Sequence, residues 1–229
     1  MVLLSPSSGA LKSLLRICES HAVAHGLRYN ARKSEFVMFR PNKPEHHRFT
    51  FASVQRYPTF PQFTLNGETL KRVDKFKYLG HWVTADQSDG TDMERERRAL
   101  SVRCNMLARR FARCTEQVKI TLFKAYCQSF YTCSLWVNFT QRTYSDLRVQ
   151  YNNAYRVLMR LPRYCSASTM FAVSNIPSFA AIMRARCASI MRRLRGSRNS
   201  ILGALSDRWD SPLLRRWVGL HAPEWSALN

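Results

Sequence analysis

The sequence is poor in acidic residues, in paired cysteines and in long apolar runs. It holds 15 Asp and Glu against 36 Lys and Arg, which gives a formal net charge of +21 and a pI of about 10.4. None of the seven cysteines forms a C-x-x-C pair, which argues against a zinc knuckle and favours free thiols in a reducing compartment. No apolar run approaches the ~20 residues that span a bilayer, and Val2-Leu3-Leu4 is too short for a signal peptide. We expect a cytoplasmic or nuclear protein, neither secreted nor membrane-spanning.

The excess of positive charge predicts an anionic partner. Nucleic acid is the usual partner of such a protein, and a ribosome-associated protein or a membrane-surface binder are the alternatives. Between Gln117 and Ser206 the only acidic residue is Asp146, although solvated helices normally mix both signs. This span favours a phosphate-binding surface. Its thirteen basic residues are Lys119, Lys124, Arg142, Arg148, Arg156, Arg160, Arg163, Arg184, Arg186, Arg192, Arg193, Arg195 and Arg198.

No autonomous active site is apparent in the sequence. It has no G-x-x-x-x-G-K-[ST] phosphate loop, no G-x-S-x-G elbow and no H-E-x-x-H helix. His46 and His47 have no acidic or cysteine partner at ligand spacing, so we predict no metal site. Asp92, Glu94 and Glu96 are interpreted as charges favoured by the N-terminus of a helix.

The first third of the chain reads as mixed α/β, and the whole as an α+β protein. Ser7 or Ser8 caps a first helix, and Asn66-Gly67 between extended runs predicts a type I′ hairpin. A polar linker follows at 85–90. The expected strands are 2–4, buried, then 34–39, 47–54 and one continuous strand over 76–84.

Beyond the linker the pattern is helical, with a domain over 91–195 and a basic C-terminal tail over 196–229. Thr91 and Glu94 predict a capping box. Pro162 and Pro177 separate later helices. At ~100° per residue, one face of the first helix carries Met93, Leu100, Cys104, Leu107 and Phe111, and the opposite face Arg95, Arg98, Arg109 and Arg113. The apolar faces expected of the next helices are Val118/Leu122/Tyr126/Phe130/Cys133, Leu147/Tyr151/Ala154/Leu158 and Phe179/Ile182/Met183/Ile190/Leu194.

Two ordered motifs carry a resemblance to a known family. The segment "NARKS" (30–34) matches an Asn-x-x-Lys-Ser/Thr motif, and "YLG" (78–80) a Tyr-Leu-Gly strand. In this order, with "RCTEQVKITLFKAYCQSFYTCSLWVNF" following, the chain resembles the later palm and thumb of a non-LTR (LINE-type) retrotransposon reverse transcriptase. The resemblance implies a partial palm over 1–84, made of a helix and antiparallel strands with a primer-grip-like strand, followed by an all-helical thumb-like domain.

The resemblance also implies where the catalytic groups lie. The family's Tyr-x-Asp-Asp hairpin runs into a strand like Val2-Leu3-Leu4, so Met1 corresponds to the residue after the second aspartate. The catalytic aspartates and the Mg²⁺ they hold would lie before Met1. We therefore expect a fragment of an RNA-directed DNA polymerase that does not polymerise alone, with no cofactor of its own. A missing upstream polymerase segment is a possible partner.

The residues carried over from the family support nucleic acid rather than catalysis. Lys33 matches a palm lysine that is proposed to help protonate the leaving pyrophosphate. It could take this accessory role only beside a bound nucleotide. The alternative is an exposed lysine at the entrance of a strand. Gly80 would let the backbone approach the primer end, unless it marks a bulge. The matching primer-grip residues are Phe76, Tyr78, Leu79 and Gly80, and the thumb residues expected to hold phosphates of an RNA or RNA–DNA template–primer duplex are Arg95, Arg98, Arg109, Arg113, Lys119 and Lys124.

Aromatic residues among the basic ones have two readings, base stacking or core packing. Helical spacing favours core for Tyr144, Tyr151 and Tyr155, while Trp136 and Phe139 stay open, and the late tryptophans (209, 217, 225) are expected to pack the tail onto the helices. Two alternatives to the polymerase fragment remain: a non-catalytic RNA/DNA-binding module, and a poorly folded product of a decayed element with an exposed edge strand near 2–4 or 34–39.

Overall fold

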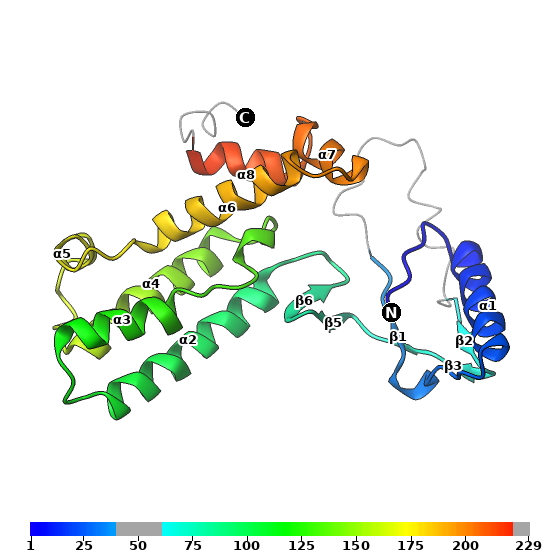
Figure 1. Cartoon of the computed structure of the whole chain (residues 1–229), viewed down its shortest axis with the longest axis horizontal. Helices are drawn as coiled ribbons and strands as arrows, with labels where there is room; N and C mark the ends of the chain where they lie inside the picture. The colour runs from blue at the N-terminus through cyan, green and yellow to red at the C-terminus, as the bar shows by residue number, and fades with distance from the viewer. Residues whose placement is uncertain (40–60, 222–229) are drawn as a thin grey trace. The chain divides into compact units, whose positions relative to one another are not determined.

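The structure is a computed structural model that describes residues 1–39 and 61–221. The strand expected at 47–54, the histidines at 46 and 47 and the tryptophan at 225 lie outside the described residues. Helices and short strands are both present (Figure 1), in agreement with a mixed α+β chain. The strands are β1 (Glu35–Phe36), β2 (Thr64–Leu65), β3 (Glu68–Thr69), β4 (Lys71–Arg72), β5 (Lys75–Tyr78) and β6 (His81–Thr84). The helices are α1 (Ser8–Ala24), α2 (Gly90–Arg110), α3 (Glu116–Cys127), α4 (Gln141–Met159), α5 (Ala167–Val173), α6 (Phe179–Arg195), α7 (Ser200–Asp207) and α8 (Pro212–His221).

The contacts divide the described chain into two compact units. The first holds the described residues up to Lys77 together with Val83–Gln87, and the second holds Tyr78–Trp82 and the described residues from Ser88 onward. The last step between the units, from Gln87 to Ser88, falls inside the polar stretch 85–90.

In the first unit, α1 packs on β2, as Figure 1 shows. Ser7 caps α1 as predicted, because its hydroxyl accepts a hydrogen bond from the amide of Ala10 at 3.2 Å. The strands pair in twos: β1 runs parallel to β4, with Glu35 opposite Lys71, and β2 is antiparallel to β3. The small apolar core consists of Leu15, Ala31, Phe63, Leu65 and Leu70.

The predicted Asn66-Gly67 hairpin is confirmed. It joins β2 to β3, and the two turn residues have φ of 52° and 79°. Positive φ at both central residues is the mark of a type I′ turn, which asparagine and glycine tolerate best.

Three strand predictions differ from the structure. Residues 2–4 form no strand, and Leu4 is 78% exposed; the described strands of this unit pair with one another instead, β1 with β4 and β2 with β3. The continuous strand expected over 76–84 is broken into β5 and β6, since Leu79 and Gly80 have φ of 46° and 87° and turn the chain back. The strand expected over 34–39 shrinks to β1.

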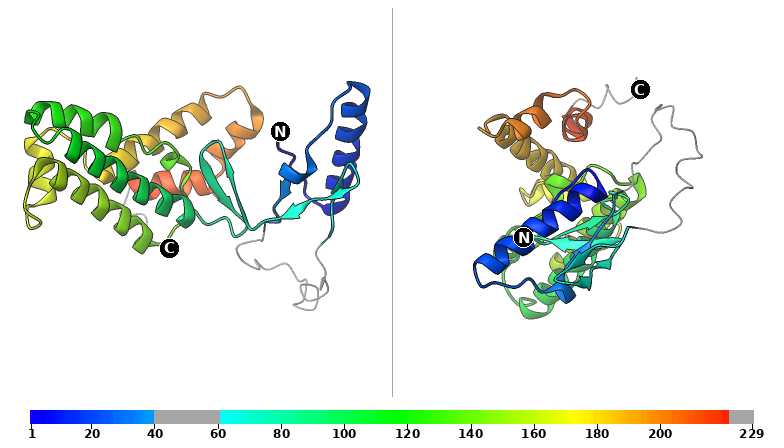
Figure 2. Two further views of the ribbon diagram at one scale, coloured as in Figure 1. Left: turned by 90° about the horizontal axis from the view of Figure 1, so that it is seen from below. Right: turned by 90° about the vertical axis from the view of Figure 1, so that its right-hand side faces the viewer.

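In the second unit, α2 packs mainly against α4, as Figure 2 also shows. All four apolar residues predicted for α4, Leu147 to Leu158, are buried. An aromatic cluster continues the core toward α6, with neighbouring ring centroids 5.0 to 6.0 Å apart. Its members are Phe123, Phe130, Tyr151, Tyr155, Phe171 and Phe179.

The face predicted for the helix after Val118 was wrong in part: Phe130 and Cys133 are buried as predicted, but they lie beyond the end of the helix. α3 ends at Cys127, and its buried residues are Ile120, Phe123 and Cys127. Val118 and Tyr126 are 43% and 48% exposed, because the helix turns a different side toward α2 and α4. For α6, burial of Phe179, Ile182, Met183 and Leu194 is confirmed, whereas Cys187 and Met191 were missed and Ile190 is half-buried.

The segment expected to be a basic tail contains two helices. α7 and α8 both pack against α6 (Figure 1). Arg216 of α8 is half-buried and donates hydrogen bonds to the carbonyls of Cys133 at 2.8 Å and Ser134 at 3.1 Å. Trp217 is half-buried, but Trp209 is 81% exposed, so its predicted packing onto the helices was wrong.

Candidate nucleic-acid interface

The helix α2 has one buried face and one solvent face. Met93, Leu100, Cys104 and Leu107 are buried, as predicted, and Phe111, just after the helix, is half-buried. Arg98, Arg109 and Arg113 are exposed on the opposite side. Val102, Asn105 and Met106 separate Arg98 from Arg109, so the exposed basic side chains gather at the C-terminal end of the helix and just after it. Exposed basic side chains grouped on one side are suited to contact a phosphate backbone.

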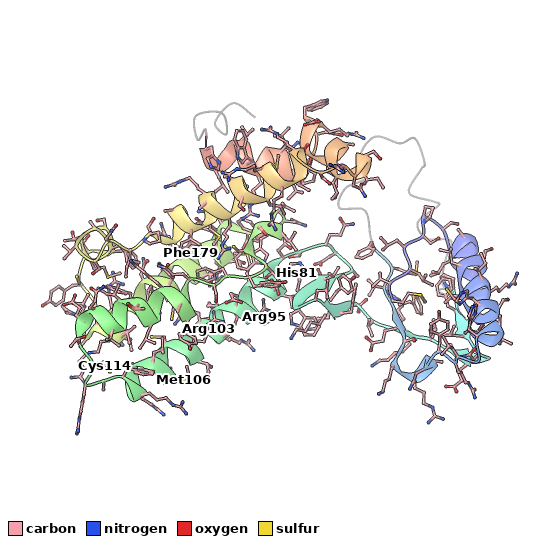
Figure 3. The ribbon with its side chains drawn as sticks, viewed as in Figure 1. His81, Arg95, Arg103, Met106, Cys114 and Phe179 are labelled. Atoms are coloured by element: carbon pink, nitrogen blue, oxygen red, sulfur yellow. The ribbon has the colours of Figure 1, made fainter. Side chains whose placement is uncertain are left out.

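A shallow depression of about 420 Å³ lies on the solvent side of α2. Its lining residues are Val102, Asn105, Met106, Arg109 and Arg110. Figure 3 shows Met106 and Cys114 toward the C-terminal end of α2, away from His81 and Arg95. Val102 is 69% exposed. Uncovered apolar atoms therefore lie near the exposed arginines Arg109 and Arg110, and Arg113 follows just after the helix.

The charge of Arg98 is shared with a neighbouring carboxylate. Glu94 accepts hydrogen bonds from Arg97 at 2.7 Å and from Arg98 at 2.8 Å. These bonds, that from Arg97 first, lower the pKa of Glu94 to about 2. Arg98 keeps an exposed side chain, but part of its field is already neutralised by Glu94.

Arg95 does not lie on the solvent face. Its guanidinium donates to Asp92 at 2.9 Å and lies 3.2 Å from Glu96. A phosphate at Arg95 would have to compete with two buried carboxylates. The α2 side chains placed to meet a phosphate are therefore those of its second half.

Asp92 is the centre of a buried hydrogen-bond cluster. It is fully buried and accepts bonds from the Thr132 hydroxyl at 2.6 Å and the Trp136 indole at 2.8 Å. His81 and the backbone amide of Trp82 each donate to it at 3.1 Å, and Arg95 completes the set. Burial alone would raise the pKa of Asp92, but these donors hold it well below its usual range. The cluster fixes the start of β6 to α2 and to the segment before α4.

Asp89 sits beside this cluster. Its carboxylate accepts hydrogen bonds from the backbone amides of Val137 and Asn138, both at 2.7 Å. It also lies 3.7 Å from Nε2 of His81. Burial raises the pKa of Asp89. The predicted capping box was wrong: α2 begins one residue before Thr91, and the amide of Gly90 is met by the Ser88 hydroxyl instead.

The Tyr78–Gly80 turn carries the predicted primer-grip residues to different environments. Phe76 is half-buried within β5, whereas Tyr78 is 47% and Leu79 76% exposed. Gly80 has positive φ, as Leu79 does, and belongs to the turn between β5 and β6 rather than to a bulge. The exposed groups of this segment are the side chains of Tyr78 and Leu79.

The "NARKS" segment forms one closed turn. The Asn30 side-chain oxygen accepts a hydrogen bond from the backbone amide of Lys33 at 3.1 Å, and the Ser34 hydroxyl donates one to the carbonyl of Asn30 at 2.8 Å. The asparagine and the serine at the two ends of the motif therefore both serve to close this turn by local hydrogen bonds. Lys33 itself is exposed.

The two lysines of α3 differ in exposure. Lys119 is half-buried, and Lys124 is exposed at the edge of a groove of about 370 Å³ between α3 and α6. Arg186 lines the same groove, so two cations from separate helices line it together with small side chains such as Ala125, Ala181 and Ala185. Lys124 and Arg186 are far apart in the sequence, so the sequence alone did not indicate that they line one groove.

The aromatic residues weighed as stacking platforms belong to the core. Trp136, Tyr151 and Tyr155 are at most 1% exposed, and Phe139 stacks on the half-buried Tyr144 at 5.9 Å. Exposed rings do exist, at Tyr131, Tyr164 and Trp209, and sequence reasoning missed them. The helical period finds core residues, but these three lie in the connections between helices.

Within residues 1–39 and 61–221, no group of three or more His, Cys, Asp or Glu side chains could hold a metal ion. Over the same residues, every helix is too short or too polar to cross a membrane. No protein-family model matches the chain, and no curated protein or solved structure matches it.

Proposed function

We propose that this chain binds the sugar–phosphate backbone of RNA and of RNA–DNA template–primer duplexes. In this proposal the helical unit acts as a thumb of the kind found in non-LTR retrotransposon reverse transcriptases, and the first unit is part of the palm. The ordered NARKS and YLG motifs and the net charge of +21 support it.

The observation that carries the proposal is the basic end of α2. Arg109, Arg110 and Arg113 are exposed, and no carboxylate of the described residues lies within ion-pair distance of them. Like-charged side chains gathered at the end of a helix without carboxylate partners repel each other in the free protein. Phosphate groups of a bound duplex would remove that repulsion and release condensed counterions.

We further propose that the chain contributes binding rather than polymerase chemistry. The carboxylates at the start of α2 serve protein donors: Asp92 and Asp89 hold backbone and side-chain groups, and Glu94 and Glu96 hold arginines. A polymerase site needs carboxylates that converge on two ions ~4 Å apart. Diverting these residues to metals would break the packing they support.

The competing proposal is a poorly folded product of a decayed element. It is favoured by the exposed apolar side chains of Met1, Val2 and Leu4. A thermal melt separates the two, because a folded binding module unfolds in one cooperative transition and a poorly folded chain does not.

The function is tested by fluorescence anisotropy with a labelled RNA–DNA duplex. We expect the triple variant Arg109→Gln, Arg110→Gln, Arg113→Gln to bind at least tenfold more weakly than wild type at moderate salt, since duplex affinity depends on the number of phosphates neutralised. The matched control removes the same charge from exposed residues of the first unit, with Lys12→Gln, Arg16→Gln and Arg28→Gln. Equal weakening of binding by both triples would mean that only the net charge matters.

A further inference from the structure

The turn between α7 and α8 is closed by its own hydrogen bonds. Arg208 donates from two guanidinium nitrogens to Asp210, at 2.9 Å and 2.7 Å, and the amide of Ser211 donates to the carbonyl of Arg208 at 3.0 Å. A bidentate arginine–carboxylate pair fixes direction as well as distance. Trp209 lies between these paired residues, so its position is set by the turn.

Trp209 presents its indole to solvent from this turn. It is 81% exposed, although tryptophan buries more apolar area than almost any other side chain. Trp217 provides the contrast within the same segment. It is half-buried, it stacks on His221 with ring centroids 5.1 Å apart, and Arg195 lies 5.5 Å from its ring. An exposed aromatic ring on a fixed turn is a ready surface for another flat group.

The chemistry around Trp209 points to an anionic ligand. The guanidinium carbon of Arg215 lies 6.0 Å from the Trp209 ring centroid, and Arg215 is itself exposed. One of the two aspartates nearby, Asp210, is already paired with Arg208. Residues 192–216 carry two aspartates, at 207 and 210, against seven arginines, at 192, 193, 195, 198, 208, 215 and 216.

We propose that the α7–α8 turn binds single-stranded nucleic acid, with a base stacked on Trp209 and the adjoining phosphate held by Arg215. Aromatic rings flanked by arginines bind single strands in this way without reading sequence, because every base has a stacking face. The site is separate from the α2 surface proposed for duplexes, and its binding does not depend on that surface.

An apolar protein segment is the other occupant that the turn could take, since Ile201 and Leu205 of α7 are 70% and 38% exposed. The arginine beside the ring and the one-signed charge of the segment favour nucleic acid. The test below separates the two.

The test is the affinity of the full chain for a 12-nucleotide oligo(dT), followed by anisotropy. We expect Trp209→Ala to bind at least about fivefold more weakly and Trp209→Phe to stay within about threefold of wild type. Arg215→Gln should reduce the slope of log affinity against log salt by about 0.7, the value for one phosphate of a single strand. Affinity for the RNA–DNA duplex should not change in Trp209→Ala.

Tyr131→Ala is the matched control, because Tyr131 is 79% exposed in the connection between α3 and α4. It should bind oligo(dT) like wild type, and melting temperatures should show that both alanine variants are folded. Wild-type affinity of Trp209→Ala for oligo(dT) would overturn the proposal and leave an apolar protein segment as the occupant of the turn. Equal losses for oligo(dT) and duplex would also overturn it, since the site would then not be specific for single strands.

Discussion

The buried carboxylate of Asp92 accepts a hydrogen bond from the Trp136 indole at 2.8 Å, across 44 residues of sequence. The same carboxylate holds the amide of Trp82 in β6. One side chain of α2 therefore ties the segment after the Tyr78–Gly80 turn to the segment that enters α4. Asp92 thus positions the start of β6, directly after this turn, on the helical unit.

Replacing Asp92 should be strongly destabilising. We expect Asp92→Ala to lower the free energy of unfolding by about 3–5 kcal/mol, because Arg95 and His81 lose a buried partner. Urea unfolding followed by circular dichroism measures it. Asp146→Ala removes an exposed aspartate and serves as the control, with a change below about 0.5 kcal/mol. Similar losses in both variants would show that the cluster does not stabilise the fold.

The stability of the protein should fall in acid. Since the folded state holds the pKa of Asp92 well below its usual range, only the unfolded state takes up this proton as the pH falls past about 4. The contribution of Asp92 is fully present above about pH 5 and is lost progressively below about pH 4. Unfolding free energies measured from pH 5.5 to 3 should fall more steeply in wild type than in Asp92→Asn, by up to about 1.4 kcal/mol per pH unit. Parallel curves would contradict this assignment.

We expect Leu79 to lower the free energy of unfolding and to increase the affinity for the duplex. Its φ of 46° is unfavourable for a bulky side chain that is 76% exposed and gains little from packing. Leu79→Asn should raise the free energy of unfolding by about 1 kcal/mol, because asparagine tolerates this conformation better. As an exposed residue of the predicted primer grip, Leu79 should also contact the primer, so Leu79→Asn should weaken binding to the RNA–DNA duplex in the anisotropy assay. Leu79→Ala removes the same side chain without relieving the backbone, so it should lose affinity without gaining stability.

The cysteines should fall into two classes of reactivity. Cys104, Cys127, Cys133 and Cys187 are buried, and burial raises the pKa of Cys127 to about 12 and those of Cys104 and Cys133 to about 11. Cys18, Cys114 and Cys165 are only half-buried. Titration with an aromatic disulfide reagent at pH 8 should modify three thiols quickly and the other four only after unfolding. Fast modification of all seven would mean that the helical core is not formed.

The sequence predicted those features of the fold that depend on residues close together in the chain, such as a tight turn or the apolar face of one helix. Asn66-Gly67 required positive φ at both residues and formed the expected turn. The apolar period of α4 identified Leu147, Tyr151, Ala154 and Leu158 because two turns of helix repeat the same face. The Leu79–Gly80 turn was missed because leucine gives no signal for a left-handed conformation.

The interactions that depend on distant residues were not predictable in the same way. Asp92 was interpreted as a helix-terminal charge, and its partners Thr132 and Trp136 lie 40 and 44 residues away. The helical period alone places Arg95 on the solvent face. Its guanidinium instead pairs with Asp92, a buried carboxylate that also accepts hydrogen bonds from β6 and from the segment before α4. Among the phosphate-binding residues predicted on and just after α2, Arg109 and Arg113 are the ones with neither such burial nor such a partner in the described residues.

The salt dependence of RNA–DNA duplex binding tests the central claim most directly. Wild type and the first-unit triple variant (Lys12, Arg16 and Arg28 to Gln) should show the same steep fall of log affinity with log salt. The α2 triple variant (Arg109, Arg110 and Arg113 to Gln) should have a slope shallower by about 2 to 3, at about 0.9 for each phosphate that the protein no longer neutralises. Equal slopes in all three proteins would contradict the claim, because the basic end of α2 would then hold no phosphates.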